Sequence, residues 1–444
     1  MEELPLAIPA TPAPAPPPEP PDPNQKRRIA LAAGLALLWG GFALLAQFSG
    51  ALDALEEPLL DWRQSMHSYP VKPSDQLALV SIEPTPARPW PWSRFDYALV
   101  LRSLIDYTPQ SIVFEMNLND RDTDYTSSDT TFSHMVERAN VVVFAATALT
   151  SNDPTPHPLK LGVLPFHGDT SLIPRYGSAI WPLETFAGES PVGVNNLESE
   201  MGLRVRRVPL IFMLNQKMVP SLSLQAAAQY LNADLASSEV QVGRAIFLKR
   251  KDGRLLRTIP IDDQGRMRIR YHAGSAASWL ATSENVLVYD DQIQHGMRPD
   301  HDLRGVARRQ VWIGRTDTTQ RERYNTALGQ LSRVEIQLQG ERTILDQDYV
   351  RPMPPMILAA LYLLIAIGGA VAVIKLGPKH SAAALIVLLA FWVEASIFAF
   401  RLYNVILPMP GFFMLILGTY VAGFLARYWE LEPESDPRQL PLDI

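Results

Sequence analysis

The sequence predicts an α/β domain with a mostly parallel sheet, flanking helices and a β-meander insertion, held in a membrane by four helices. The membrane part rests on four apolar stretches, which contain a single charged residue (Glu394) and cover residues 29–52, 356–374, 381–400 and 405–426. Each is close to the roughly 20 residues that a spanning helix needs. The α/β part rests on residues 77–147, where short β-branched runs alternate with amphipathic segments, as in a sheet covered by helices.

Hydropathy divides the chain into segments, with one spanning helix before the domain and three after it. In order, they are a proline-rich cytoplasmic tail (1–25), a transmembrane helix (26–52), an extracytoplasmic domain (53–351), three further transmembrane helices (352–375, 380–401 and 404–428) and a short acidic cytoplasmic tail (429–444). The first tail is expected to be disordered, because proline blocks helices and the segment has little to bury.

Charges at the ends of the apolar runs predict the orientation. Residues 26–28 are Lys-Arg-Arg before the first run, whereas acidic residues follow it over 53–61. The positive-inside rule therefore places the N-terminus in the cytoplasm and the domain outside. The lysines of the loop 375–380 and Arg427 then fall inside, in agreement. The first run exceeds the about 7–15 apolar residues of a signal peptide, so an uncleaved anchor is predicted.

The first half of the domain is predicted to alternate helices and strands. Residues 51–67 form a juxtamembrane helix whose apolar face contains Leu52, Leu55, Leu59 and Leu60. Runs that are apolar on both faces, as in buried parallel strands, cover 77–83, 111–116 and 141–147. Amphipathic helices are predicted between these strands, over 94–107 and 130–139.

The second half is predicted to be less regular, beginning with a proline-rich loop over 151–187. Turn residues at 252–253 and 264–265 separate strands of a meander, which are expected at 208–213, 245–250, 255–261 and 267–271, with a helix over 221–230. A buried strand over 310–314 and a helix over 333–345 complete the domain. Pro352, Pro354 and Pro355 then stop any continuous helix from the domain into the membrane.

Composition excludes several classes of function. The net charge of −6 arises from 40 basic and 46 acidic residues, without the basic patch that a nucleic-acid partner requires. The chain has no cysteine, which removes disulfides, thiolate metal sites and cysteine nucleophiles. It also lacks a phosphate loop, a dinucleotide fingerprint and a nucleophile elbow. No enzymatic activity and no cofactor are therefore predicted.

Short motifs are spread over most of the domain. They are Leu79-Val80-Ser81-Ile82-Glu83, Pro89 to Arg94 (PWPWSR), Ile112 to Asn117 (IVFEMN), Gly193-Val194-Asn195-Asn196, Arg204 to Pro209 (RVRRVP), Pro220-Ser221-Leu222 and Trp312 to Thr316 (WIGRT). Together they resemble the second class of CHASE domain, an extracytoplasmic sensory domain associated with bacterial cyclases and histidine kinases. The order of one span, domain and three spans also resembles that family.

The resemblance implies a sensory, non-enzymatic protein of the bacterial inner membrane that binds an unknown ligand or partner. In the family a cyclase or kinase domain commonly follows the last span, but here the tail 429–444 is too short to fold alone. The signal is therefore expected to pass in trans to a separate effector chain. The alternative is a structural or assembly subunit of a bacterial envelope complex that senses nothing. Association into a homo-oligomer through span glycines is a further expectation.

Six residues are candidates for ligand binding. Glu83 and Glu115 are predicted near the carboxyl ends of adjacent parallel strands, where ligands usually bind. The two carboxylates could act as an acid/base pair or bind a cation, or they could hydrogen-bond strand-end amides. Trp90, Trp92 and Arg94 could line a pocket at the start of a helix, or form a fixed turn that caps the core. Arg315 follows from the resemblance alone. Two features depart from the family. Glu83 and Glu115 stand where the family usually has Asp. The segment 331–338 keeps only Val-Glu-Ile of a longer family motif.

Two membrane residues are candidates for coupling, and no metal site is predicted. Glu394 and Arg401 lie two turns apart on one helix; the carboxylate is expected to reach toward Arg401 at the outer surface, or to contact a partner span. Asp120, Asp122 and Asp124 have the spacing that opens a calcium loop, but that loop needs Gly and Glu where the chain has Tyr125 and Thr131.

Overall fold

The computed structural model describes residues 24–66, 74–122, 126–151, 161–198, 204–273, 278–298, 302–319 and 322–429. Apart from residues 24, 25 and 429, the two predicted tails lie outside these ranges. The chain forms two compact units. We call them the span unit, which is residues 1–53, 353–396 and 408–444, and the domain unit, which is residues 54–352 and 397–407.

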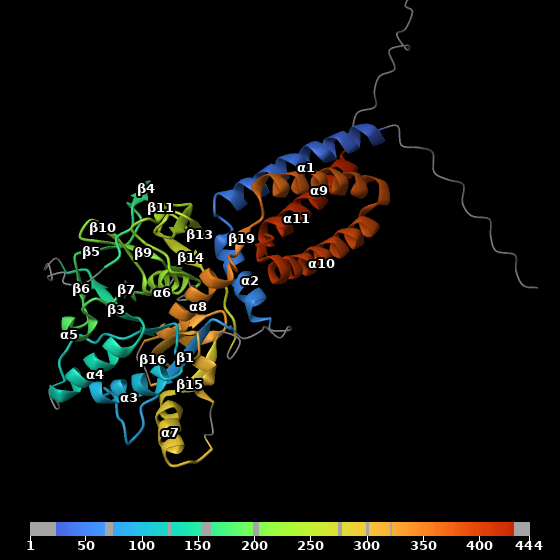
Figure 1. Cartoon of the computed structure of the whole chain (residues 1–444). Coiled ribbons are helices and arrows are strands. Elements are labelled where there is room, and N and C mark those ends of the chain that lie inside the picture. Colours follow the sequence, from blue (N-terminus) through green and yellow to red (C-terminus); the bar gives the residue numbers. More distant parts are fainter. Residues whose placement is uncertain are drawn as a thin grey trace, which may run out of the picture. The chain divides into compact units, whose positions relative to one another are not determined.

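A sheet of seven strands forms the centre of the domain unit (Figure 1). Its strands are β15 (Trp279–Thr282), β1 (Leu77–Ile82), β16 (Gln310–Arg315), β2 (Ser111–Phe114), β3 (Val142–Leu149), β7 (Val192–Val194) and β6 (Ser178–Ile180). They lie in the order β15-β1-β16-β2-β3, and β3 also pairs with both β6 and β7. All pairings are parallel except that of β6. The predicted α/β fold with a mostly parallel sheet is therefore confirmed.

The two faces of the sheet carry separate hydrophobic cores, because successive side chains of a strand point to opposite faces. On β1, Val80 and Ile82 pack on one side with the helices α3 (Arg94–Ile105), α4 (Thr126–Arg138) and α7 (Ser283–Gln294). Leu77 and Leu79 pack on the other side with α6 (Leu222–Leu231) and α8 (Arg333–Asp346). Figure 1 shows α3 beside α4 and α6 beside α8, on the two sides of these strands.

The local signals that start these helices are side-chain caps. Ser93 caps α3 and Ser332 caps α8, each in a reciprocal capping box with an acidic residue three positions on. Ser221 caps α6 by accepting a hydrogen bond from the Leu224 amide. Such caps satisfy backbone N–H groups that have no partner within the helix. They fix where the helices begin, at the same edge of the sheet as the predicted site.

The predicted meander consists of small separate sheets. They are β10 (Lys217–Pro220), β9 (Ile211–Leu214) and β5 (Arg175–Tyr176); β13 (Leu255–Pro260), β12 (Ala245–Lys249), β11 (Glu239–Gln241) and β4 (Phe166–His167); and β14 (Arg266–Arg268) with β8 (Arg207–Pro209). The single strand predicted over 208–213 was wrong, because Leu210 separates β8 from β9 and each pairs with a different strand. The loop predicted over 151–187 was also wrong in its described part, which holds β4, β5, β6 and α5 (Glu184–Ala187).

Further elements were not predicted, namely β15, α7, a 3-10 helix η2 (Leu303–Val306) and the hairpin of β17 (Arg323–Thr326) and β18 (Gly329–Ser332). The hairpin precedes α8 directly, so it sets the position at which that helix begins.

Among the described residues, four helices are long and apolar enough to cross a membrane, as predicted, with one near the N-terminus and three near the C-terminus. They are α1 (Gln25–Phe48), α9 (Pro355–Leu376), α10 (Pro378–Tyr403) and α11 (Pro410–Tyr428). Gly40 of α1 lies against Ala366 and Leu415, and Gly369 of α9 lies against Thr419. These glycines allow close helix packing. The neighbouring glycines Gly41 and Gly368 face open space instead.

Residues 397–407, which are the end of α10 and the connection to α11, belong to the domain unit. In this connection β20 (Val405–Ile406) pairs in parallel with β19 (Arg351–Pro352), the last strand before α9. Within the domain unit, α2 (Asp53–Ser65) contacts the same segment. We call α2, β19 and residues 397–407 the juxtamembrane cluster.

Candidate functional site

A cavity of about 310 Å³ lies where the turn before α3 meets the loop after β2. Trp90, Trp92 and Arg94 line it, so the structure brings together three of the six predicted ligand-binding residues. The Trp90–Pro91 peptide bond is cis. Trp92 is buried and its ring lies 5.7 Å from that of Tyr97, which also lines the cavity. Trp90 is 39% exposed and forms the rim.

The loop after β2 supplies the polar part of the lining. Its residues 116–122 include Asn117, Asn119, Asp120, Arg121 and Asp122. The guanidinium of Arg94 donates to the Asp120 carbonyl oxygen over 2.7 Å, and the Arg94 amide donates to the Asp122 carboxylate over 3.2 Å. These contacts close the loop onto the start of α3. Aromatic faces beside amides and charges, in a volume of this size, suit a small polar organic molecule.

Two of the remaining candidates lie at the same edge of the sheet, outside the cavity lining. The Arg315 guanidinium stacks over the Trp90 ring at 4.4 Å and pairs with Asp317 through two contacts of 2.8 Å. It therefore supports the rim of the cavity from the end of β16. Glu83 is exposed and accepts a hydrogen bond of 3.2 Å from Ser81. The prediction that Glu83 and Glu115 end adjacent strands was wrong, because β16 lies between β1 and β2.

Glu115 lies on the opposite face of the sheet from the cavity. It follows Phe114 and precedes Met116, both of which pack on the α3 side, so the alternation of a strand turns Glu115 toward α8. There its Oε1 accepts a hydrogen bond of 3.1 Å from Asn195 and lies 3.8 Å from the Arg333 guanidinium. Burial raises the pKa of Glu115 to about 7, although Arg333 and Asn195 oppose this shift.

A chain of hydrogen bonds connects the cavity loop to α8. Thr147 donates to Asn117 of the cavity lining over 2.9 Å and approaches the Asn195 Oδ1 at 2.7 Å. Gln337 of α8 donates to the Asn195 carbonyl oxygen over 3.3 Å. Asn195 is fully buried, so these contacts replace water in a region with a low dielectric constant. The resemblance had marked Asn195 as part of a motif, but its position between the cavity and α8 is visible only in the structure.

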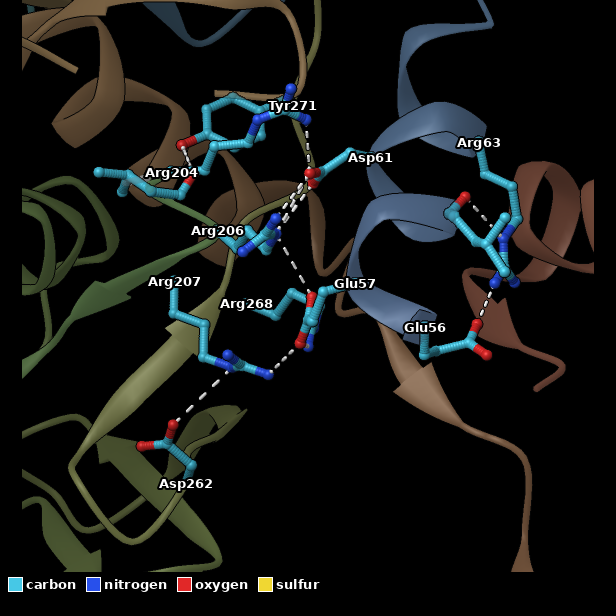
Figure 2. A network of polar contacts seen from close by, with 12 residues as sticks. Glu56, Glu57, Asp61, Arg63, Arg204, Arg206, Arg207, Asp262, Arg268 and Tyr271 are labelled. Carbon is cyan, nitrogen blue, oxygen red and sulfur yellow. Dashed lines mark hydrogen bonds and ion pairs between the residues drawn. The ribbon is translucent and has the colours of Figure 1, made fainter. Parts of the chain in front are cut away.

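The juxtamembrane helix α2 presents two charged stripes rather than the predicted leucine face (Figure 2). One stripe contains Glu57, Asp61 and Gln64, which are spaced four and three residues apart and therefore lie on one side of the helix. Of the predicted leucines, Leu60 is buried and Leu55 is 60% exposed. Hydrophobic periodicity failed here because the surface that receives α2 is itself charged.

Four arginines form ion pairs with the acids of the first stripe, and three of them belong to the motif Arg204 to Pro209. Asp61 accepts hydrogen bonds from Arg204 and Arg206, with 2.8 Å to the shared Oδ2 in each case. Glu57 accepts from Arg207 over 2.9 Å and from Arg268 over 2.6 and 2.7 Å. We call these six residues the ion-pair network (Figure 2). Gln64 extends it by accepting from the Tyr271 amide over 3.1 Å.

The electrostatics of the ion-pair network stabilise the charged form of Glu57. Burial alone would raise its pKa, but the hydrogen bonds and charges of Arg268 and Arg207 lower it to about 2. Bidentate arginine–carboxylate pairs of this kind are strong and geometrically specific. Glu57 therefore stays ionised over the whole physiological pH range and holds α2 on the β8–β14 ribbon.

The second stripe of α2 faces residues 397–407. It contains Glu56, Leu60 and Arg63, and Figure 2 shows Glu56 and Arg63 on the side of α2 away from the ion-pair network. Arg63 is buried, forms an ion pair with Glu56 and donates to the Leu407 carbonyl oxygen over 3.1 Å. Leu60 packs in a small core with Val350 and Phe400. Residues that follow the first span thus hold the connection between the last two.

The candidates for membrane coupling have different surroundings. Arg401 belongs to the domain unit and donates to the Met66 carbonyl oxygen at the end of α2 over 2.9 Å. Glu394 belongs to the span unit and is exposed on α10. Of the acids with calcium-loop spacing, Asp122 accepts a hydrogen bond from the Arg94 amide, and Asp124 lies outside the described residues.

These features define a class of protein: a multi-pass membrane protein with an α/β domain between its first and second spans. The family model of the CHASE2 domain matches residues 33–374, and the chain therefore belongs to the CHASE2 domain family. CHASE2 is a family of extracytoplasmic sensory domains, which confirms the resemblance seen in the sequence. No curated protein and no solved structure matches the chain.

Proposed function

We propose that this protein is a receptor of the bacterial inner membrane. In this proposal a small polar molecule binds in the cavity around Trp90, Trp92 and Arg94, and the juxtamembrane cluster passes the change to the spans. The spans then signal to a separate effector chain. The proposal includes no catalytic step. The observation that carries it concerns α2 and residues 397–407. Both segments pack within the domain unit, although one follows the first span and the other joins the last two spans.

A physical route between the cavity and the juxtamembrane cluster supports the proposal. Asn117 of the cavity connects through Thr147 and Asn195 to Gln337 of α8. Two residues beyond the end of α8, the Asp348 carboxylate accepts a hydrogen bond of 3.2 Å from Asn404 of the juxtamembrane cluster. A helix is a rigid element, so a displacement at one end moves the other. Such a route is a necessary condition for coupling, which a ligand produces only if it binds two states with different affinities.

The test of ligand binding is a thermal-shift screen of the full chain in detergent. Amino acids, sugars, nucleosides and small organic acids are compared on the wild type, on Asn119→Ala in the cavity, and on Asn285→Ala in α7 as a matched control. We expect one chemical class to raise Tm in the wild type and in Asn285→Ala, but not in Asn119→Ala.

The same experiment separates the receptor from the alternative of an assembly subunit. A ligand present at 100 times its Kd stabilises a folded protein by about 2.7 kcal/mol, which a thermal shift detects readily. If no compound stabilises the wild type and a second protein co-purifies with it in stoichiometric amounts from native membranes, the assembly role replaces the receptor role.

A further inference from the structure

Three side chains with metal-binding atoms converge beside the C-terminus of α8. His272 follows strand β14, Asp346 is the last residue of α8, and Asp348 lies two residues beyond. One ligand atom from each lies within 4.8 Å of the other two. Gln347, at a φ of 58°, ends the helix between the two acids. The sequence gives no sign of this group, because more than 70 residues separate the histidine from the acids.

The imidazole of His272 is the observation that points to a ligand. His272 is only 7% exposed, and its Nε2 is buried without a hydrogen-bond partner among the described residues. The Asp348 Oδ2 lies 3.6 Å from this nitrogen, which is longer than a hydrogen bond. The histidine is nevertheless held firmly, since Gln339 accepts from its amide over 3.1 Å and donates to its carbonyl oxygen over 2.6 Å.

We propose that His272, Asp346 and Asp348 bind a divalent transition-metal ion, for which Zn²⁺ is the best fit. Zn²⁺ takes imidazole nitrogen and carboxylate oxygen at about 2.0–2.2 Å, which places neighbouring ligands of a tetrahedral site about 3.4 Å apart. The observed 3.6 Å between His272 and Asp348 is close to that spacing. The three ligand atoms lie within 4.8 Å of one another, so a small movement of the Asp346 side chain would bring it to the same ion. Mg²⁺ and Ca²⁺ prefer oxygen ligands alone, and the imidazole therefore disfavours them.

Surrounding donors orient both carboxylates. Arg342 donates to Asp346 over 2.9 Å, and Asn404 donates to Asp348 over 3.2 Å. Such outer contacts fix the geometry of metal ligands. Arg342 and Arg270 also place positive charge beside the group, which weakens cation binding. The site therefore binds its ion reversibly, and three protein ligands leave a fourth position for water.

The ion would connect two segments, the one after β14 and the end of α8, beside the juxtamembrane cluster. Asp348 contacts Asn404, which lies between α10 and α11, so a bound ion would fix the end of α8 next to that connection. A signalling role for the ion rests on the proposed function, whereas the binding site itself does not.

The test measures binding of Zn²⁺ to the full chain in detergent, purified without a histidine tag and stripped with a chelator. Isothermal titration gives stoichiometry and affinity, and replacement by Co²⁺ reports a tetrahedral site through its visible absorption. The variants are His272→Gln and Asp346→Asn. The matched control is His295→Gln, because His295 also lies beside an acid, 3.4 Å from Asp291, but is exposed.

We expect one Zn²⁺ per chain, at least a tenfold loss of affinity in each site variant and unchanged affinity in His295→Gln. Because Asp346 is exposed, Asp346→Asn keeps the test decisive if His272→Gln does not fold. Absence of stoichiometric binding to the wild type, or wild-type affinity in Asp346→Asn, would overturn the proposal. If Zn²⁺ binds but no small molecule stabilises the protein, the metal site stands and the proposed ligand binding in the cavity fails.

Discussion

Three glutamates of the domain unit show how surroundings set the ionisation of one residue type. Arg207 and Arg268 lower the pKa of Glu57 to about 2 despite burial. Glu115 has one distant arginine, and burial raises its pKa to about 7. Glu341 of α8 is fully buried, and burial raises its pKa to about 8, opposed by a hydrogen bond of 2.5 Å from the Trp312 indole. Buried carboxylates without a cation favour the protonated form.

Glu341 predicts a pH dependence of stability. Its folded pKa of about 8 exceeds the value of 4.5 for the unfolded chain, so the folded state binds more protons between these values. The free energy of unfolding therefore decreases as pH rises from about 4.5 to 8. We expect Glu341→Gln, which is neutral at every pH, to remove this part of the loss, on the order of 3–5 kcal/mol.

The measurement is the Tm of the full chain in detergent between pH 5 and pH 8.5, compared between the wild type and Glu341→Gln. The exposed Glu137→Gln serves as the control and should follow the wild type. Parallel Tm profiles for the wild type and Glu341→Gln would show that Glu341 is ionised in the folded protein.

At the scale of elements, the sequence predicted what depends on local patterns. Strands β1, β2 and β3 are apolar on both faces, so the sheet could be predicted. The motif Pro89 to Arg94 marked Trp90, Trp92 and Arg94, which line the cavity. The insertion of β16 between β1 and β2 could not be predicted, because strand order is set by contacts between distant residues. The side of the sheet on which Glu115 lies follows from strand alternation and could have been predicted.

The prediction of which face of α2 is buried was wrong for a physical reason. Hydrophobic periodicity finds a face that packs on an apolar core, but α2 packs through Glu57 and Asp61 on arginines that are 143 to 211 residues away in the chain. The segment 397–407 was assigned to spans and a short loop because it is apolar. Its packing against α2 depends on Phe400 and Leu60, which are 340 residues apart in the sequence. No local pattern can predict a contact over that separation.

Phe400 gives a prediction with a control on the same helix. Phe400 is fully buried, packs with Leu60 and Val350, and lies under the Arg270 guanidinium at 4.3 Å, whereas Phe398 is 60% exposed. Phe400→Ala should destabilise the domain unit by about 3–5 kcal/mol, because truncation leaves a cavity. Phe398→Ala should have little effect.

Limited proteolysis of the full chain in lipid nanodiscs measures this difference at the juxtamembrane cluster. We expect faster cleavage around residues 59–66 and 403–407 in Phe400→Ala, with Phe398→Ala unchanged from the wild type. Equal cleavage of the two variants would mean that residues 397–407 do not stabilise the domain unit.

At the scale of the molecule, the chain passes between its two units at residues 53–54, 352–353, 396–397 and 407–408. On the domain side, all four passages lie in or directly beside the juxtamembrane cluster. The ion-pair network fixes the first passage, and Arg63, Phe400 and the β19–β20 pairing fix the others. In the proposed receptor, a change inside the domain would therefore reach the spans through this cluster.

The most direct test of that claim uses the absence of cysteine from the chain. Spin labels on Lys26→Cys in α1 and Lys375→Cys in α9 report the distance between two spans, measured by pulsed electron resonance in nanodiscs. The label pair is compared in the wild type, in Glu57→Gln/Asp61→Asn, and in Asp302→Asn, whose exposed pair with Arg304 is the control. We predict a shifted or broadened distance distribution in the double variant alone, with the domain still folded by circular dichroism. Superimposable distributions in all three proteins would contradict coupling through the juxtamembrane cluster.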